Sequence, residues 1–122
     1  MRCLRIALIP VYQPTEQLIT LLHEAKSKGF QIVVVDDGSD KSTNDIFESA
    51  ARFGTVLRHM QNMGKGQAIK TGLSFIQRQY AADCIIVTLD ADGQHRVADA
   101  QKICQVAQDH PNALVLGSRR LK

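Results

Sequence analysis

Short aliphatic runs recur along the 122-residue chain, and each run ends at a proline, a glycine or a polar residue. Runs that are this short and apolar at consecutive positions are typical of strands buried on both faces of a sheet. The pattern therefore predicts strands at residues 4–9, 31–35, 55–57, 84–89 and 113–116.

The segments between these runs carry apolar residues at helical spacing. In the first segment they stand at i, i+3, i+4 and i+7, and Gly29 follows as a helix-ending glycine. In the second, Ser42 and Asp45 form a weak capping box ahead of an amphipathic stretch that reaches Gly54. A third helix is predicted after Gly64, and a fourth over the stripe Ala100, Ile103, Cys104 and Ala107.

The alternation of buried strands with helices indicates the fold class. Parallel strands joined by right-handed helical crossovers form a sheet that helices cover on both faces. We therefore expect an α/β, Rossmann-like three-layer sandwich with a mostly parallel sheet, about five strands and about four helices. The length fits one domain over residues 1–122.

The composition of the chain limits which partners and which cellular compartment are expected. Fifteen Lys and Arg residues against twelve Asp and Glu leave a charge of +3 that forms no stripe, so nucleic acid is not the expected partner. Three cysteines without CxxC spacing argue against a disulfide framework or a zinc site. The apolar run after the basic start is too short for a signal peptide, and no run approaches the roughly 20 residues of a membrane span. The expectation is a cytoplasmic chain without a transmembrane segment.

The stretch LDADGQH follows the predicted strand at residues 84–89 and is rich in oxygen ligands. Asp90 and Asp92 stand at i and i+2, so in extended backbone their carboxylates point to the same side, and Gln94 comes two residues later. Such a set suits Mg²⁺ or Mn²⁺. The spacing alone equally fits a loop that caps the next helix.

Other polar clusters also follow predicted strands, where ligands bind in open α/β sheets. Asp36 and Asp37 could accept hydrogen bonds from a ribose or a base, or could simply form a turn. Residues 64–66, Gly-Lys-Gly before a helix, could approach phosphate, although they match neither a P-loop nor GxGxxG. Arg119 is a candidate anion ligand or an exposed terminal residue. Of the four histidines, His95 lies nearest these clusters, and surface positions are expected for His23, His59 and His110.

Taken together, five blocks in this order resemble the nucleotide-sugar half of inverting family 2 glycosyltransferases of the GT-A fold. The blocks are IPVYQP, VVVDDGSD, NMGKGQAIKTGL, LDADGQH and LGSRR. They span nearly all of the chain, and they are most similar to dolichyl- and polyprenyl-phosphate sugar transferases. The resemblance favours the metal interpretation of Asp90 and Asp92 over the helix cap.

The resemblance also implies roles for individual residues. Pro10, Tyr12 and Asp37 match positions that line the nucleoside pocket. Arg119 matches an arginine near the donor or acceptor phosphate. Lys65 matches a nucleotide-sugar-binding position of the family more weakly. Asp90 and Asp92 match the DXD motif of the family, which handles the ribose and the metal-bound diphosphate, and Gln94 matches a further metal contact in the polyprenyl-phosphate relatives. The implied cofactor is Mg²⁺ or Mn²⁺.

One departure from the family concerns the acceptor. Family members continue past the GSR block with an acceptor half that supplies the catalytic base, and no base can be placed in this chain. The resemblance therefore implies a donor-binding half that is incomplete for catalysis alone. Its donor is a nucleoside-diphosphate sugar, its acceptor a polyprenyl phosphate or a glycan, and any membrane association comes through a missing segment or a partner.

Two other classes of protein remain open. A receiver-like signalling domain also gathers acids around Mg²⁺, but its acidic pair ends the first strand, whereas here Asp36 and Asp37 end the second. A non-catalytic fragment could pair with another chain, for example as a homodimer, through the exposed edge of the predicted strand at residues 113–116.

Overall fold

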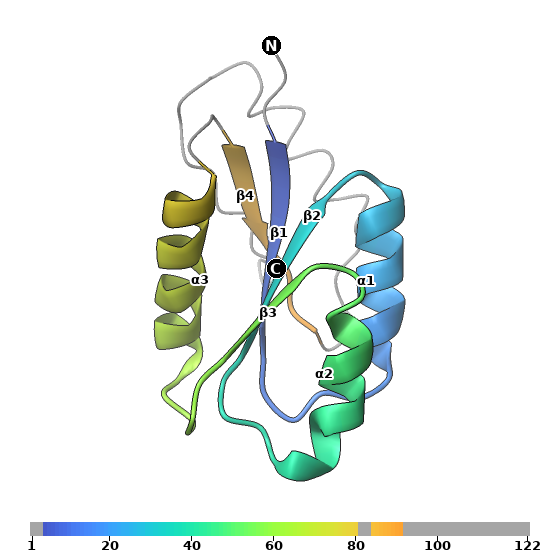
Figure 1. The fold of residues 1–122 in the computed structure, drawn as a ribbon, viewed down its shortest axis with the longest axis vertical. Coiled ribbons are helices and arrows are strands. Elements are labelled where there is room, and N and C mark those ends of the chain that lie inside the picture. The colour runs from blue at the N-terminus through green and yellow to red at the C-terminus, as the bar shows by residue number, and fades with distance from the viewer. Residues whose placement is uncertain (1–3, 81–83, 92–122) are drawn as a thin grey trace, which may run out of the picture.

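The computed structural model describes residues 4–80 and 84–91, which form four strands and three α-helices (Figure 1). The strands are β1 (Leu4–Val11), β2 (Gln31–Asp36), β3 (Thr55–Arg58) and β4 (Cys84–Thr88). The helices are α1 (Gln17–Ser27), α2 (Asn44–Ala50) and α3 (Lys65–Gln79), and the 3-10 helix η1 (Lys41–Thr43) precedes α2. These elements confirm the first four predicted strands and the first three helices. The predicted strand at 113–116 and the fourth helix lie outside the described residues.

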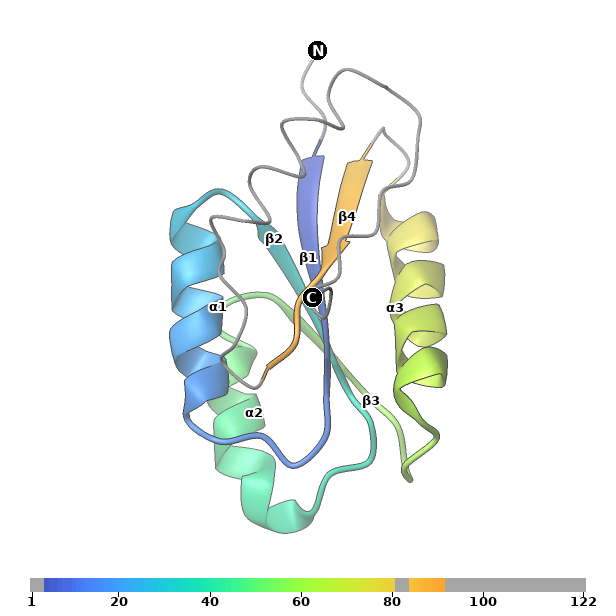
Figure 2. The same ribbon diagram turned by 180° about the vertical axis from the view of Figure 1, so that it is seen from behind.

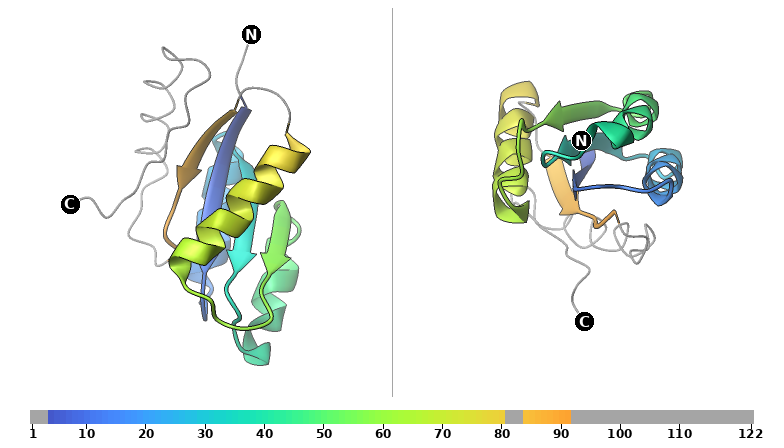
Figure 3. Two further views of the ribbon diagram at one scale, coloured as in Figure 1. Left: turned by 90° about the vertical axis from the view of Figure 1, so that its left-hand side faces the viewer. Right: turned by 90° about the horizontal axis from the view of Figure 1, so that it is seen from below.

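The strands form one sheet in the order β3-β2-β1-β4, and every pair is parallel. Helices α1 and α2 lie on one face of the sheet and α3 lies on the other (Figures 1 and 2). The views from the side and from below show the resulting three layers (Figure 3). The predicted α/β class and three-layer architecture are therefore confirmed.

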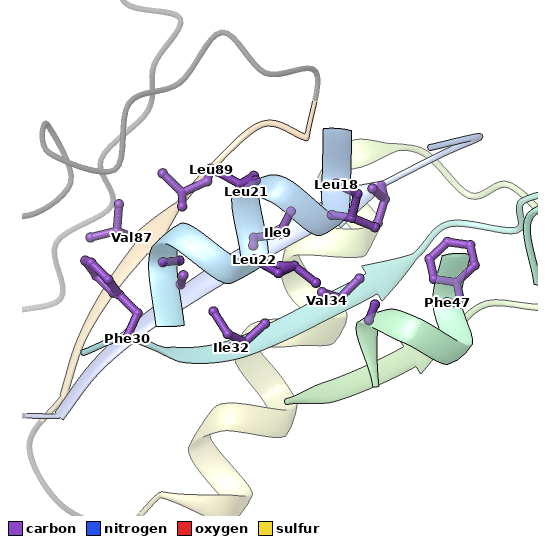
Figure 4. Packing of buried hydrophobic residues seen from close by; sticks show 14 of the residues in the cluster. Ile9, Leu18, Leu21, Leu22, Phe30, Ile32, Val34, Phe47, Val87 and Leu89 are labelled. Atoms are coloured by element: carbon purple, nitrogen blue, oxygen red, sulfur yellow. The ribbon is translucent and has the colours of Figure 1, made fainter. Parts of the chain in front are cut away.

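Successive strand residues point to opposite faces of the sheet, and each face has its own hydrophobic core. Strands that are buried on both faces therefore consist of continuous apolar runs. On one face Ile9, Val34 and Val87 pack with α1, α2 and Phe30 (Figure 4). On the other face Leu8 packs against α3. Both faces of β1 and β2 are thus buried, and polar chemistry is confined to the strand ends.

Strand β1 is central in the sheet but contains Pro10, which is tolerated because the pairing with β4 stops next to it. Strand β1 continues past Pro10 to Val11, two residues beyond the predicted end. The Leu8 carbonyl accepts a hydrogen bond from Leu89 N–H (3.1 Å), and the Val11 carbonyl accepts one from Asp37 N–H (2.8 Å) on the opposite side. Pro10 therefore faces the β4 side, where it has no N–H to continue the ladder. Pairing between β1 and β4 ends at this point, so the segments that follow the two strands can diverge.

Helix ends show one confirmed and one wrong prediction. After α1, Gly29 has a φ of 91°, and Phe30 N–H donates to the Ala25 carbonyl, a Schellman-type ending. The predicted capping box of Ser42 and Asp45 is wrong, because Ser42 lies in η1 and its N–H donates to the Asp40 carboxylate. The second helix consequently starts later and ends at Ala50 rather than near Gly54.

Close packing of α3 on the sheet depends on Gly72. A Cβ atom at Gly72 would lie 2.2 Å from Leu8 Cδ1, and Leu8 is fully buried. We expect Gly72→Val to lower the free energy of unfolding by about 1–3 kcal/mol through overpacking. Gly66→Val is the control, since a Cβ at Gly66 in the same helix meets no atom within 4 Å. Equal urea midpoints for the two variants would contradict this packing argument.

Candidate functional site

The candidate site lies at the carboxyl edge of the sheet, where the loops following all four strands gather. Strand β1 lies between β2 and β4. The chain passes from β1 to β2 on one side, and only later returns to the other side of β1 to form β4. The carboxyl ends of β1 and β4 therefore flank a switch point in strand order, the place where open α/β sheets bind ligands. Tyr12 follows β1 here and is 56% exposed, whereas Pro10 is half-buried.

Asp37 connects the loop after β2 to the loop after β3. Its Oδ1 accepts hydrogen bonds from Met63 N–H and from His59 Nδ1, both at 2.8 Å, and its Oδ2 accepts one from Gly64 N–H at 2.9 Å. The residue is 4% exposed. Asp37 thus holds the protein's own main chain, a role that its sequence position did not reveal.

The environment of Asp37 favours the charged carboxylate. Burial raises the pKa of Asp37, but hydrogen bonds from Met63 N–H, His59 and Gly64 N–H together outweigh burial. The net effect is a pKa below the usual value of 3.8. The carboxylate is therefore ionised at neutral pH and can accept all three donors.

The side chain of His59 is buried and links two parts of the fold, so the prediction that it lies on the surface is wrong. Its side chain is 8% exposed, because Asp37 from the loop after β2 lies on one side of the ring and Thr71 from α3 lies on the other. The distance from His59 Nε2 to Thr71 Oγ1 is 2.8 Å. His59 follows β3 directly, so the rule that polar residues after strands gather at one edge could have identified it. The prediction for His23 is confirmed, since that residue is exposed on α1.

The loops after β1, β2 and β3 are also held together by backbone packing and by hydrogen bonds to side chains. Gly38 has a φ of 78°, and a Cβ atom there would lie 2.3 Å from the Gln61 carbonyl carbon, so no side chain fits. Gln13 N–H donates to Ser39 Oγ (2.9 Å), and Asp40 N–H donates to Gln13 Oε1 (2.5 Å). These contacts give the edge a defined shape.

Asp36, the other half of the acidic pair, has a structural role. It is 1% exposed, and its carboxylate accepts hydrogen bonds from Arg58 Nε (2.8 Å) and Ser39 N–H (2.9 Å). The Arg58 guanidinium also lies 5.0 Å from the Phe47 ring centroid and donates to Asn44 Oδ1. Asp36 therefore ties the end of β2 to Arg58 of β3, and Arg58 in turn contacts α2. The carboxylate of Asp36 is buried away from solvent.

Lys65 and Asp90 meet although 25 residues separate them in sequence. Helix α3 begins at Lys65 after Gly64, whose φ is 98°, and Asp90 follows β4. The distance from Lys65 Nζ to Asp90 Oδ1 is 2.8 Å, and the side chains are 54% and 28% exposed. A carboxylate and an ammonium group that remain accessible at the switch point are suited to bind a cation and an anion, respectively.

The remaining predicted site residues, Asp92, Gln94 and Arg119, lie outside the described residues, as does His95. Within residues 4–80 and 84–91, no group of three or more His, Cys, Asp or Glu side chains converges to hold a metal ion. In the same ranges, no helix is both long enough and apolar enough to cross a membrane.

The family model described as glycosyl transferase family 2 matches residues 6–122. An uncharacterized protein of Methanocaldococcus jannaschii is 33% identical over 93% of this chain and 45% of its own length. The UDP-N-acetylglucosamine–dolichyl-phosphate N-acetylglucosaminyltransferase of Methanococcus voltae is 30% identical over 92% of this chain and 50% of its own length.

A bacterial relative extends the comparison. The undecaprenyl-phosphate 4-deoxy-4-formamido-L-arabinose transferase of Edwardsiella ictaluri is 33% identical over 81% of this chain and 32% of its own length. The chain spans about half the length, or less, of these curated relatives. No solved structure gave a significant match.

Proposed function

The chain belongs to glycosyl transferase family 2, and from this premise we propose that it is the donor-binding half of an inverting, metal-dependent glycosyltransferase. Family membership favours this proposal over a receiver-like domain. The donor is a nucleoside-diphosphate sugar, and the acceptor is a lipid phosphate or a saccharide. The Methanococcus voltae relative is named for a UDP-sugar and dolichyl phosphate, and the Edwardsiella ictaluri relative is named for undecaprenyl phosphate, which supports this donor and this acceptor.

The observation that carries the proposal is the placement of Lys65 and Asp90 at the switch point, beside loops that are already interlocked. A nucleoside diphosphate presents ribose hydroxyls, which need acceptors, and a diphosphate, which needs cations. In this proposal Asp90 serves the ribose and the metal, Lys65 serves the diphosphate, and Pro10, Tyr12 and Asp37 form the nucleoside side of the pocket. Arg119 adds a second cation for a phosphate.

The donor set Asp90, Asp92 and Gln94 consists of oxygen ligands, which fits Mg²⁺ or Mn²⁺. Such an ion, when bound, neutralises charge that develops on the leaving diphosphate. In this proposal Lys65 and Arg119 would stabilise the same charge. The acceptor oxygen would displace the diphosphate in one step from the opposite face of the sugar, which inverts the anomeric centre.

Transfer also needs a base for the acceptor proton, and we assign none to this chain. We therefore expect the 122-residue chain to bind the donor but to transfer the sugar slowly or not at all without a further segment or a partner. A pairing partner, including a second copy of this chain, remains part of the proposal. The strand at 113–116 on which the homodimer prediction rests lies outside the described residues.

Calorimetric titration of the chain with UDP- and GDP-sugars, with Mn²⁺ and with EDTA, tests donor binding and metal dependence together. We expect Mn²⁺ to strengthen binding at least about 10-fold and Asp92→Asn to remove most of that gain, because a lost charged contact is worth about 1.5–3 kcal/mol. Asp45→Asn, a change at an exposed carboxylate in α2, is the matched control. Equal affinities for Asp92→Asn and the wild type in Mn²⁺ would refute the metal role, and absence of any binding would refute the proposed function.

A further inference from the structure

We propose that His59 is a positioning residue for the donor site: its imidazole fixes the Asp37 carboxylate and, through it, the loop that leads into Lys65. The inference rests on the proposed function for its consequence, donor affinity. The structural claim, that His59 and Asp37 fix the loop before Lys65, can be tested without any ligand. His59 acts through other groups, since its side chain is only 8% exposed.

His59 contacts three groups that are distant in sequence, one through its main chain and two through its imidazole ring. His59 N–H donates to the Asp36 carbonyl (2.8 Å), which anchors the main chain at the end of β3. In the ring, Nδ1 lies 2.8 Å from Asp37 Oδ1 and Nε2 lies 2.8 Å from Thr71 Oγ1 in α3. Since a carboxylate only accepts, Nδ1 carries the proton in the contact with Asp37. The ring therefore fixes Asp37 relative to both β3 and α3.

The effect reaches Lys65 through the main chain. Asp37 Oδ1 and Oδ2 accept the N–H groups of Met63 and Gly64, and Lys65 is the next residue and the first of α3. Without the His59 contact, the Asp37 side chain can rotate, and the two N–H groups lose a fixed acceptor. The main chain at Lys65 is then no longer held in one position, and neither is its ammonium group, which lies 2.8 Å from Asp90 in the intact site.

The order carboxylate, imidazole, hydroxyl also occurs in nucleophilic triads. Here, however, the carboxylate uses its other contacts to hold two backbone N–H groups of a loop. That division of contacts is suited to holding the loop, and it gives a test that a merely space-filling histidine would fail.

The test compares His59→Asn, His59→Gln and His59→Phe in the full chain. Asparagine places an N–H where Nδ1 stands, glutamine places one where Nε2 stands, and phenylalanine keeps the ring shape without polar atoms. We expect donor affinity in Mn²⁺ to fall about 10-fold for Phe and Gln and to stay within about 3-fold for Asn, as expected for loss of one hydrogen bond to a charged group. The exposed residue His23 provides the control variant His23→Phe.

Amide hydrogen exchange at Met63 and Gly64, measured by NMR without ligand, separates this inference from the proposed function. We expect faster exchange at both amides in His59→Phe and near wild-type exchange in His59→Asn. Unchanged exchange in His59→Phe, or equal affinities for Asn, Gln and Phe, would overturn the positioning role. If the wild type binds no donor, the proposed function fails, while the exchange rates still decide whether His59 holds the loop. Should His59→Phe fail to fold, the contrast between Asn and Gln decides.

Discussion

Asp37→Ala is expected to lower the free energy of unfolding by about 3–5 kcal/mol, the range for breaking a buried, hydrogen-bonded charge interaction. The substitution leaves three donors, Met63 N–H, Gly64 N–H and His59 Nδ1, without their acceptor in a region where Asp37 is 4% exposed. Urea denaturation of wild type and variant measures the loss. Asp45→Ala, at an exposed position, should cost far less. A loss below about 1 kcal/mol would mean that water replaces the carboxylate easily.

The pH dependence of the same effect has a defined sign. The folded-state pKa of Asp37 lies below its usual value of 3.8, so the unfolded chain binds the proton more tightly. The stabilisation by this carboxylate is therefore fully present above the unfolded pKa and is lost as the pH falls through the folded pKa. We expect the stability difference between wild type and Asp37→Asn to be larger at pH 6 than at pH 2. A difference that is constant across this range would contradict the linkage.

Asp90→Asn is expected to weaken metal-supported donor binding by about 10- to 100-fold, the range for one lost charge-assisted contact. The amide keeps the shape of the side chain but removes the negative charge, so it binds a divalent cation poorly and no longer forms the ion pair with Lys65. The unfolding free energy should change by less than about 1 kcal/mol, because the pair is partly exposed. This combination separates Asp90 from Asp37, whose replacement should affect stability strongly.

The measurement for Asp90 is a donor titration in Mn²⁺ and in EDTA, with Asp45→Asn as the matched variant. In EDTA the wild type and Asp90→Asn should bind with more similar affinities than in Mn²⁺. An affinity for Asp90→Asn equal to that of the wild type in Mn²⁺ would exclude Asp90 from the donor site. An equal loss with and without the metal would limit its role to the ribose.

The elements of the fold could be predicted well because each depends on local periodicity. Four consecutive apolar positions in β2 can only be satisfied by a strand covered on both faces, and α3 and α1 supply the two covers. Element ends were less predictable. Pro10 stayed within β1 because the neighbouring strand stops beside it, and Ser42 was taken up by a 3-10 turn that Asp40 caps.

The candidate site was predicted less completely, and His59 shows why. A single histidine after a short strand looks like a solvated residue in sequence. It became buried through Asp37, which is 22 residues away, and Thr71, which is 12 residues away. Neither partner can be identified from local spacing. Asp37 was expected to line the nucleoside pocket, and its three contacts within the protein came from the same long-range packing.

The sequence alone determined the class of fold, the edge of the sheet at which polar chemistry gathers, and the family, because apolar periodicity and short motifs are local properties of the chain. Only the tertiary structure decided that β1 lies between β2 and β4, that Lys65 meets Asp90, and that His59 and Asp37 hold the loop before α3. These outcomes depend on how the crossovers and α3 pack against the sheet. Packing brings together side chains whose separation in sequence carries no signal, and at this edge it turns separate motifs into one site.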